Sequence, residues 1–115
     1  MSFEVQQGRI GGHPVLGVHG ELDLLTASGL EDAVAAALTS RPPVLVIDLT
    51  PTTFLDSSGA RQVARSARQA TRAGSALRVV CPKGNRTVRL VIDLIELHSL
   101  VPVLDSTDEI ETSGP

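Results

Sequence analysis

The sequence predicts an α/β fold: a mainly parallel sheet of about five strands that begins with an N-terminal hairpin and is packed with about four helices. Short aliphatic strands alternate with segments of helical periodicity, in the order β-β-α-β-α-β-α-β-α. The run Val44-Leu45-Val46-Ile47 is apolar throughout, as in a strand that is buried on both faces. The 115 residues, 42% of them apolar, suffice for a single domain over 1–115. Its ordered core is expected over roughly 3–111.

The first part of the chain predicts a strand at residues 3–7 and a second strand at 15–19, joined by a glycine-rich hairpin turn at 8–12. From Leu30, apolar residues recur at the i, i+3, i+4, i+7 and i+8 positions of a helix with one buried face. Thr26 or Ser28 can cap the start of this helix, and Ser28 and Glu31 have the spacing of a capping box. Pro42-Pro43 ends the helix, because proline cannot continue it.

The buried strand at 44–47 leads to a second helix and then to further strands and helices. Residues 50–54 are expected to form a loop, and a helix is expected from Ser57 to about Ala73, with Gly74 as its stop. The core face of this helix consists of small residues: Ala60, Val63, Ala64, Ala67 and Ala70. The elements predicted after it are a strand at 77–81, a helix over about 88–97, an edge strand at 100–104, and a last short helix with a capping box of Ser106 and Glu109.

Composition excludes several classes of function. The net charge is −3 and only 2% of the residues are aromatic, so a nucleic-acid surface is not expected. The one cysteine, Cys81, cannot form an internal disulfide and is expected to be an inert buried thiol. His13, His19 and His98 lack metal-ligand spacing, so neither a metal nor a cofactor is expected. No signal peptide or membrane span is visible, which indicates a cytoplasmic protein.

The most informative segment runs from Val44 to Gly59, with the sequence VLVIDLTPTTFLDSSG. A buried strand is followed by Asp56-Ser57-Ser58-Gly59 at the expected N-terminus of a helix. The first N–H groups of a helix lack partners and the dipole is positive there, so a serine could cap the helix or a phosphate could be bound. Local chemistry alone leaves both interpretations of Ser57 and Ser58 open.

The chain resembles a stand-alone STAS domain of the anti-sigma-factor antagonist kind. The resemblance covers about residues 3–111 and is carried by Gly20-Glu21-Leu22-Asp23 with Thr26, by the strand 44–49, and by Phe54-Leu55-Asp56-Ser57-Ser58-Gly59. Weaker matches are Pro82, Val88, Asp93 and Leu97. The chain departs from the family pattern in having Ala60-Arg61 where Leu-Gly is common, and Glu96 where glycine is common.

The resemblance implies a non-enzymatic, STAS-fold partner switch with Ser57 as the phosphoacceptor. The unphosphorylated form would bind an anti-sigma factor that is a serine kinase, and would thereby free the sigma factor. Phosphorylation would release the kinase, and a metal-dependent serine phosphatase would reset the switch. Further residues would shape the partner-binding surface: Asp23, Asp56, Ser58, Gly59 and Arg61. Adding about two negative charges beside Asp56 favours a local electrostatic switch over refolding.

Several alternatives remain open at this stage. A STAS adaptor subunit of a transporter or of a stress-signalling scaffold would share the fold without the phospho-switch. A response-regulator receiver could use Asp48, but the acidic pair expected at the end of its first strand is missing. A serine hydrolase is disfavoured, because no Gly-x-Ser-x-Gly motif is present. Arg61, Arg65, Arg68 and Arg72 form a stripe that is either a solvated helix face or partner surface, and a second apolar stripe at Leu90, Leu94 and Leu97 is compatible with a monomer or a weak dimer.

Overall fold

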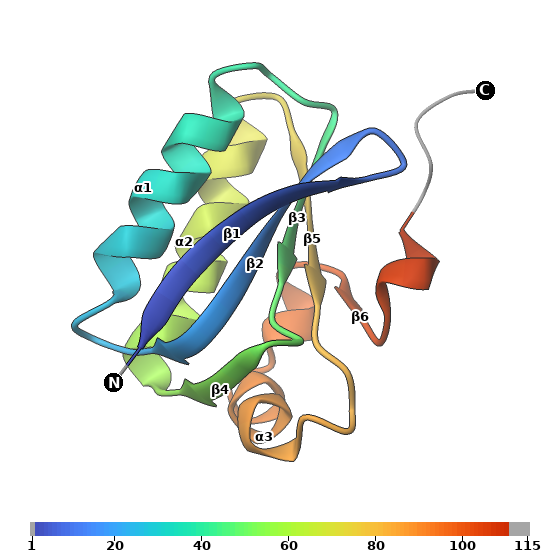
Figure 1. Cartoon of the computed structure of the whole chain (residues 1–115). Coiled ribbons are helices and arrows are strands. Elements are labelled where there is room, and N and C mark those ends of the chain that lie inside the picture. Colours follow the sequence, from blue (N-terminus) through green and yellow to red (C-terminus); the bar gives the residue numbers. More distant parts are fainter. Residues whose placement is uncertain (1, 111–115) are drawn as a thin grey trace.

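The computed structural model describes residues 2–110, which form a mixed six-stranded sheet with helices packed against it (Figure 1). The main path of the sheet has the order β1-β2-β3-β5-β6, and β4 pairs with β2 beside that path. The β1–β2 pair is antiparallel, whereas the other pairs are parallel. The strands are β1 (Phe3–Ile10), β2 (His13–Leu22), β3 (Val44–Asp48), β4 (Thr52–Leu55), β5 (Ala76–Val80) and β6 (Val103–Leu104). The predicted α/β class with its N-terminal hairpin is confirmed.

Two long helices lie side by side over one face of the sheet (Figure 1). They are α1 (Ala27–Leu38) and α2 (Ser57–Arg72). A shorter helix, α3 (Arg86–Leu94), packs against β4 near the end of the sheet. Two 3-10 turns follow, η1 (Leu97–Ser99) and η2 (Thr107–Glu109). The sheet therefore presents the carboxyl ends of β2 and β4 to the start of α2.

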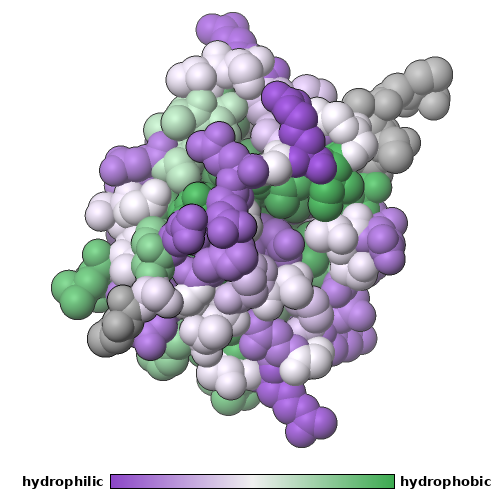
Figure 2. Space-filling view, viewed as in Figure 1, coloured by the Kyte–Doolittle hydropathy of each residue, from purple (hydrophilic) through white to green (hydrophobic). Residues whose placement is uncertain are grey.

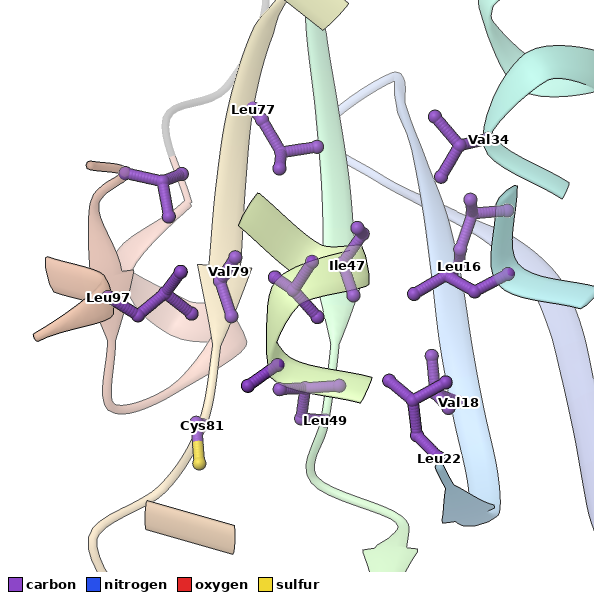
Figure 3. Close-up of a cluster of buried hydrophobic side chains, with 14 of the residues drawn as sticks. Leu16, Val18, Leu22, Val34, Ile47, Leu49, Leu77, Val79, Cys81 and Leu97 are labelled. Carbon is purple, nitrogen blue, oxygen red and sulfur yellow. The ribbon is translucent and has the colours of Figure 1, made fainter. Parts of the chain in front are cut away.

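The core is aliphatic, as the shortage of aromatic residues requires. Figure 3 shows side chains from neighbouring strands converging beneath the helices, among them Leu16 and Val18 of β2, Ile47 of β3 and Val79 of β5. A smaller cluster on the opposite face joins Val15, Val46 and Val80 to Ile110. Because Leu45 and Ile47 face the first cluster and Val46 faces the second, β3 is buried on both sides, as its sequence predicted.

The hairpin is tighter and its strands are longer than the sequence suggested. The predicted turn at 8–12 is wrong, because only Gly11 and Gly12 form the turn and Ile10 pairs with His13. Their φ angles are +57° and +83°, the positive values that a type I′ hairpin turn needs at both central positions. The glycine at position 8 instead lies within β1, opposite Val15.

The predicted loop at 50–54 is also wrong, because Thr52–Leu55 forms β4. This raises the number of strands to six. The strand pairs with the last part of β2, and the buried Thr52 hydroxyl donates a hydrogen bond to the Val18 carbonyl oxygen (2.7 Å). From the start of α3, Asn85 donates its amide to the carbonyl oxygens of Leu49 and Thr52. Hydrogen bonds to distant parts of the chain thus stabilise β4 as a strand, although the segment is too short to show strand periodicity in the sequence.

Three details of the predicted helices need correction. The Ser28–Glu31 capping box is absent, because α1 begins at Ala27. Thr26 occupies the N-cap position, but its side chain makes no capping hydrogen bond and its hydroxyl instead donates to the Glu21 carbonyl oxygen. The third helix ends before Leu97, since Glu96 adopts a left-handed conformation with φ of +55°. The last short helix is a 3-10 turn, so residues 2–110 contain three α-helices. Its predicted capping box of Ser106 and Glu109 is present.

The C-terminal strand is shorter than predicted. The edge position is confirmed, but pairing is limited to Val103 and Leu104 in place of 100–104. The preceding Leu100 is exposed, as are Leu90 and Leu94 of α3, whereas Leu97 is buried. The second apolar stripe of the third helix is therefore partly buried, because the chain leaves the helix before Leu97.

Candidate functional site

The N-terminus of α2 lies where two connecting segments meet (Figure 1). Residues 23–26 follow β2, and Asp56 follows β4. The ends of these parallel strands are in register, because Leu22 pairs with Leu55. Parallel neighbours bring their carboxyl ends to one edge of a sheet, so the two predicted motifs, residues 20–23 and 54–59, form one site.

Asp56 connects the two segments through hydrogen bonds. One carboxylate oxygen accepts from the Gly59 backbone N–H (2.8 Å), which makes Asp56 the N-cap residue of α2. The other accepts from the Leu24 N–H (3.3 Å). Its own backbone N–H donates to the Leu22 carbonyl oxygen (3.4 Å). A single side chain therefore caps the helix and holds the neighbouring loop against it.

The two serines are consequently not needed as helix caps. The interpretation of Ser57 or Ser58 as the N-cap of α2 is wrong, because Asp56 occupies that position. Ser57 is exposed and Ser58 is half-buried. Within residues 2–110, neither hydroxyl makes a side-chain hydrogen bond. The Ser57 hydroxyl is thus accessible at the positive end of a 16-residue helix.

Gly59 allows the helix to approach the end of β2 closely. A methyl group at this buried position would lie 2.2 Å from the Leu22 carbonyl oxygen and 2.9 Å from Leu55 Cδ1. Real side chains essentially never come so near, so only glycine fits without a shift of the backbone. The close contact that requires glycine is therefore one within the chain.

Asp23 organises the loop that faces Asp56. One oxygen of its side chain accepts from the backbone N–H groups of Leu25 (3.0 Å) and Thr26 (3.1 Å). The Thr26 hydroxyl donates to the Glu21 carbonyl oxygen (2.8 Å). Asp23 and Asp56 thus lie on adjacent segments that a backbone hydrogen bond joins. Asp56 is the chain neighbour of Ser57, and an acidic group beside an accessible hydroxyl makes the site sensitive to added negative charge.

Three exposed apolar residues, here called the apolar rim, lie beside the site along the chain, and the sequence did not predict their exposure. The rim consists of Leu24, Leu25 and Phe54, with exposed fractions of 72%, 83% and 43%. Figure 2 shows hydrophobic atoms protruding at the left edge, over the connection between β2 and α1. The available signal was an adjacent leucine pair between the predicted strand at 15–19 and the predicted start of the helix at Thr26 or Ser28, because leucine is unusual in connecting segments. Exposed apolar groups beside a polar centre are typical of a protein-binding surface.

Other singled-out residues lie away from this site or act locally. Asp48 accepts hydrogen bonds from the backbone N–H and the hydroxyl of Thr50, which is a turn contact. Arg61 is exposed one turn into α2. Cys81 is buried, and that burial raises the pKa of its thiol to about 11. Residues 2–110 contain no cluster of histidine, cysteine and acidic side chains that could hold a metal ion, and no helix among them could cross a bilayer.

Known proteins with a similar sequence or fold agree with this arrangement. The STAS domain family matches residues 4–110. Anti-sigma-F factor antagonist RsfB of Mycobacterium tuberculosis is 40% identical over 58 residues, which are 50% of this chain and 48% of that protein. The chain thus matches about half the length of this curated relative.

Two solved structures extend the comparison over most of the chain. An anti-sigma factor antagonist from Mycobacterium paratuberculosis is 30% identical with a TM-score of 0.83, covering 94% of this chain and 90% of that one. The anti-sigma factor antagonist SpoIIAA in its unphosphorylated form is 17% identical with a TM-score of 0.65, covering 94% and 92%, and supports the fold alone. With a family match from β1 to Ile110, the chain belongs to the STAS domain family.

Proposed function

We propose that this protein is an anti-sigma factor antagonist whose binding is switched by phosphorylation of Ser57. In the unphosphorylated form it binds a serine-kinase anti-sigma factor and frees the sigma factor. The observation that carries the proposal is the exposed Ser57 hydroxyl, which Asp56 leaves free by capping the helix. The names of relatives that share the fold support the same function.

The surroundings of Ser57 suit a phosphoacceptor better than those of Ser58. A kinase must bring its nucleotide to the hydroxyl, and Ser57 is exposed whereas Ser58 is half-buried. A phosphate on Ser57 would lie near the unpaired N–H groups of the first turn, which favour an anion. The modified protein can therefore keep its fold.

The same phosphate would weaken partner binding. The unmodified surface combines the small neutral hydroxyl of Ser57 with the apolar rim formed by Leu24, Leu25 and Phe54. A phosphate adds about 1.5 to 2 negative charges close to Asp56 and would have to be desolvated under the partner. Losing complementarity at a buried polar contact costs roughly 2 to 5 kcal/mol, a weakening of about 30-fold or more.

Binding to the serine-kinase anti-sigma factor encoded in the same genome tests the proposal. Calorimetry should give tight binding for the wild type and for Ser57→Ala, and binding about 30-fold weaker for Ser57→Asp. Ser58→Ala is the matched control, and it should still be phosphorylated by the kinase in the presence of ATP. Equal affinities of Ser57→Ala and Ser57→Asp, with phosphate incorporated elsewhere, would contradict the switch.

A second assay separates this proposal from the adaptor alternative. A metal-dependent serine phosphatase should restore kinase binding to the phosphorylated protein. Capture from lysate with the wild type and Ser57→Asp should recover the kinase with the wild type only. Recovery of the same transporter or scaffold subunits with both proteins would assign an adaptor role without a phospho-switch.

A further inference from the structure

An unpaired row of arginines runs along the exposed face of α2. Arg61, Arg65, Arg68 and Arg72, here called the arginine face, occupy the i, i+4, i+7 and i+11 positions and are all exposed. At 1.5 Å per residue the row is about 16 Å long. None of the four guanidinium groups has an ion pair or hydrogen bond with another residue in 2–110.

The arginine face differs from an ordinary solvated helix surface. Such surfaces intersperse charges of both signs, and acidic residues three or four positions away stabilise the helix. The α2 sequence SSGARQVARSARQATR contains four arginines and no acidic residue. Like charges at this spacing destabilise the helix, by about 0.2 to 0.5 kcal/mol per pair. The chain as a whole is acidic, with a net charge of −3, yet four of its 10 lysine and arginine residues lie on this one helix.

Two hollows flank the arginine face, and Arg68 and Arg72 border both. The hollow on the α1 side has a volume of about 400 Å³ and is lined by Arg65, Gln69 and Glu31 as well. The other, of about 300 Å³, has an apolar floor formed by Ala64, Ala67 and Leu100. The side chain of Leu100 is 59% exposed. Positive charge therefore lies next to an apolar groove that contains no acidic residue.

We propose that the arginine face is a second docking surface, which binds an acidic amphipathic helix of a protein partner. Acidic side chains at i, i+3 and i+7 of that helix would pair with Arg65, Arg68 and Arg72, because the two helices share the same periodicity. Its apolar side chains would cover Ala64, Ala67 and Leu100, as in other helix-in-groove complexes. The proposal does not depend on phosphorylation of Ser57.

A protein helix fits this surface better than a nucleic acid does. The four arginines lie on a single helix, and the chain as a whole has a net charge of −3, whereas a nucleic-acid-binding domain usually has a strong basic excess. Base stacking needs aromatic side chains, but the chain has only two phenylalanines and no tyrosine or tryptophan. The apolar groove beside the row instead offers a place for aliphatic side chains.

A synthetic helical peptide of about 16 residues, with glutamate along one side and leucine along the other, is the probe. Amide NMR shifts of the full chain should change in α2 from Ala64 to Arg72 and at Leu100. Affinity should fall about tenfold between roughly 50 and 300 mM NaCl, because salt screens exposed charges. A peptide with lysine in place of every glutamate should not bind.

Charge reversals locate the interaction. Arg65→Glu/Arg68→Glu should weaken peptide binding about tenfold or more. Lys83→Glu/Arg86→Glu reverses two exposed charges at the same spacing away from the groove and should change affinity less than about twofold. Ser57→Asp should bind the peptide as the wild type does, whatever its affinity for the kinase. Equal losses in both double variants, loss in Ser57→Asp, or comparable binding of a single-stranded oligonucleotide would overturn the proposal.

Discussion

Replacing Gly59 with alanine adds one methyl group at the contact between α2 and the end of β2. The added carbon would lie 2.2 Å from the Leu22 carbonyl oxygen and 2.9 Å from Leu55 Cδ1. The leucine side chain can rotate, but the carbonyl belongs to the backbone of β2, where Leu22 pairs with Leu55 of β4. The helix must therefore move away from β2, which strains the hydrogen bonds of Asp56 to Leu22 and Leu24.

Two opposing effects set the size of the loss. Alanine favours a helix over glycine by up to about 1 kcal/mol. Overpacking against backbone costs about 1 to 3 kcal/mol, and each weakened hydrogen bond costs roughly 1 kcal/mol. The net expectation for Gly59→Ala is a loss of about 2 kcal/mol in the free energy of unfolding. For a chain of this length, that loss lowers Tm by roughly 10 °C.

Urea denaturation followed by far-ultraviolet circular dichroism is the assay, since the chain has no tryptophan or tyrosine for fluorescence. Gly84→Ala is the control, because a methyl group there would meet nothing within 4 Å. Removing backbone freedom from the unfolded chain should stabilise that variant by up to about 1 kcal/mol. A Gly59→Ala protein as stable as the wild type would refute the reasoning that glycine is required at this contact.

Substitutions at three further positions test other parts of the structure by the same assay. Glu96→Gly should stabilise the fold by about 1 kcal/mol, because φ at this position is +55°; a loss of stability would argue against the left-handed conformation. Asp56→Ala should lower the free energy of unfolding by about 2 kcal/mol, because it removes the helix cap and the contact with Leu24. Asp56→Asn should lose no more than about half as much, because asparagine can also cap a helix. Equal losses in the two variants would mean that the charge of Asp56, and not its capping hydrogen bond, stabilises the fold. The thiol of Cys81 has its pKa raised from 9.0 to about 11 by burial, so unfolding releases a proton between these pH values and stability falls as pH rises through them. The advantage of the wild type over Cys81→Ala should therefore shrink by about 2 kcal/mol from pH 9 to pH 11, and an unchanged advantage would mean that the thiol is not desolvated.

The parts of the fold that could be predicted were those whose signal lies within one segment. The strand at 44–47 is apolar throughout because both of its faces are covered. The helix from Ser57 repeats small apolar residues at helical spacing, and its observed end at Arg72 lies within one residue of the prediction. By contrast, β4 has four residues with only its first and last buried, so neither helical nor strand periodicity can develop. Its hydrogen bonds come from Val18 and Asn85, more than 30 residues away in either direction.

The sequence predicted which motifs form the candidate site, but not which residue caps α2 or which apolar side chains are exposed beside it. The residues from Asp56 to Gly59 and the loop at Asp23 were identified from sequence, and the pairing of β2 with β4 brings them together. Which residue caps α2 depends on φ and ψ at Asp56, and serine and aspartate are equally good caps by type. The exposure of Leu24 and Leu25 depends on the direction of the β2–α1 connection. Composition alone cannot show this, because the sequence does not distinguish an exposed leucine from one in the core.

Capping by Asp56 separates the stability of the fold from the state of the proposed phosphoacceptor. If Ser57 were the N-cap, a phosphate would remove the hydroxyl from the hydrogen bond that starts α2, and modification would change the stability of the helix. The Asp56 carboxylate accepts from Gly59 N–H and Leu24 N–H, so an aspartate holds the start of α2 against the β2–α1 connection. A serine kinase does not modify this aspartate. The Ser57 side chain contributes no hydrogen bond within residues 2–110 that phosphorylation could break. We therefore expect the proposed switch to act on the charge of the surface that a partner meets, and the fold that presents this surface to stay the same.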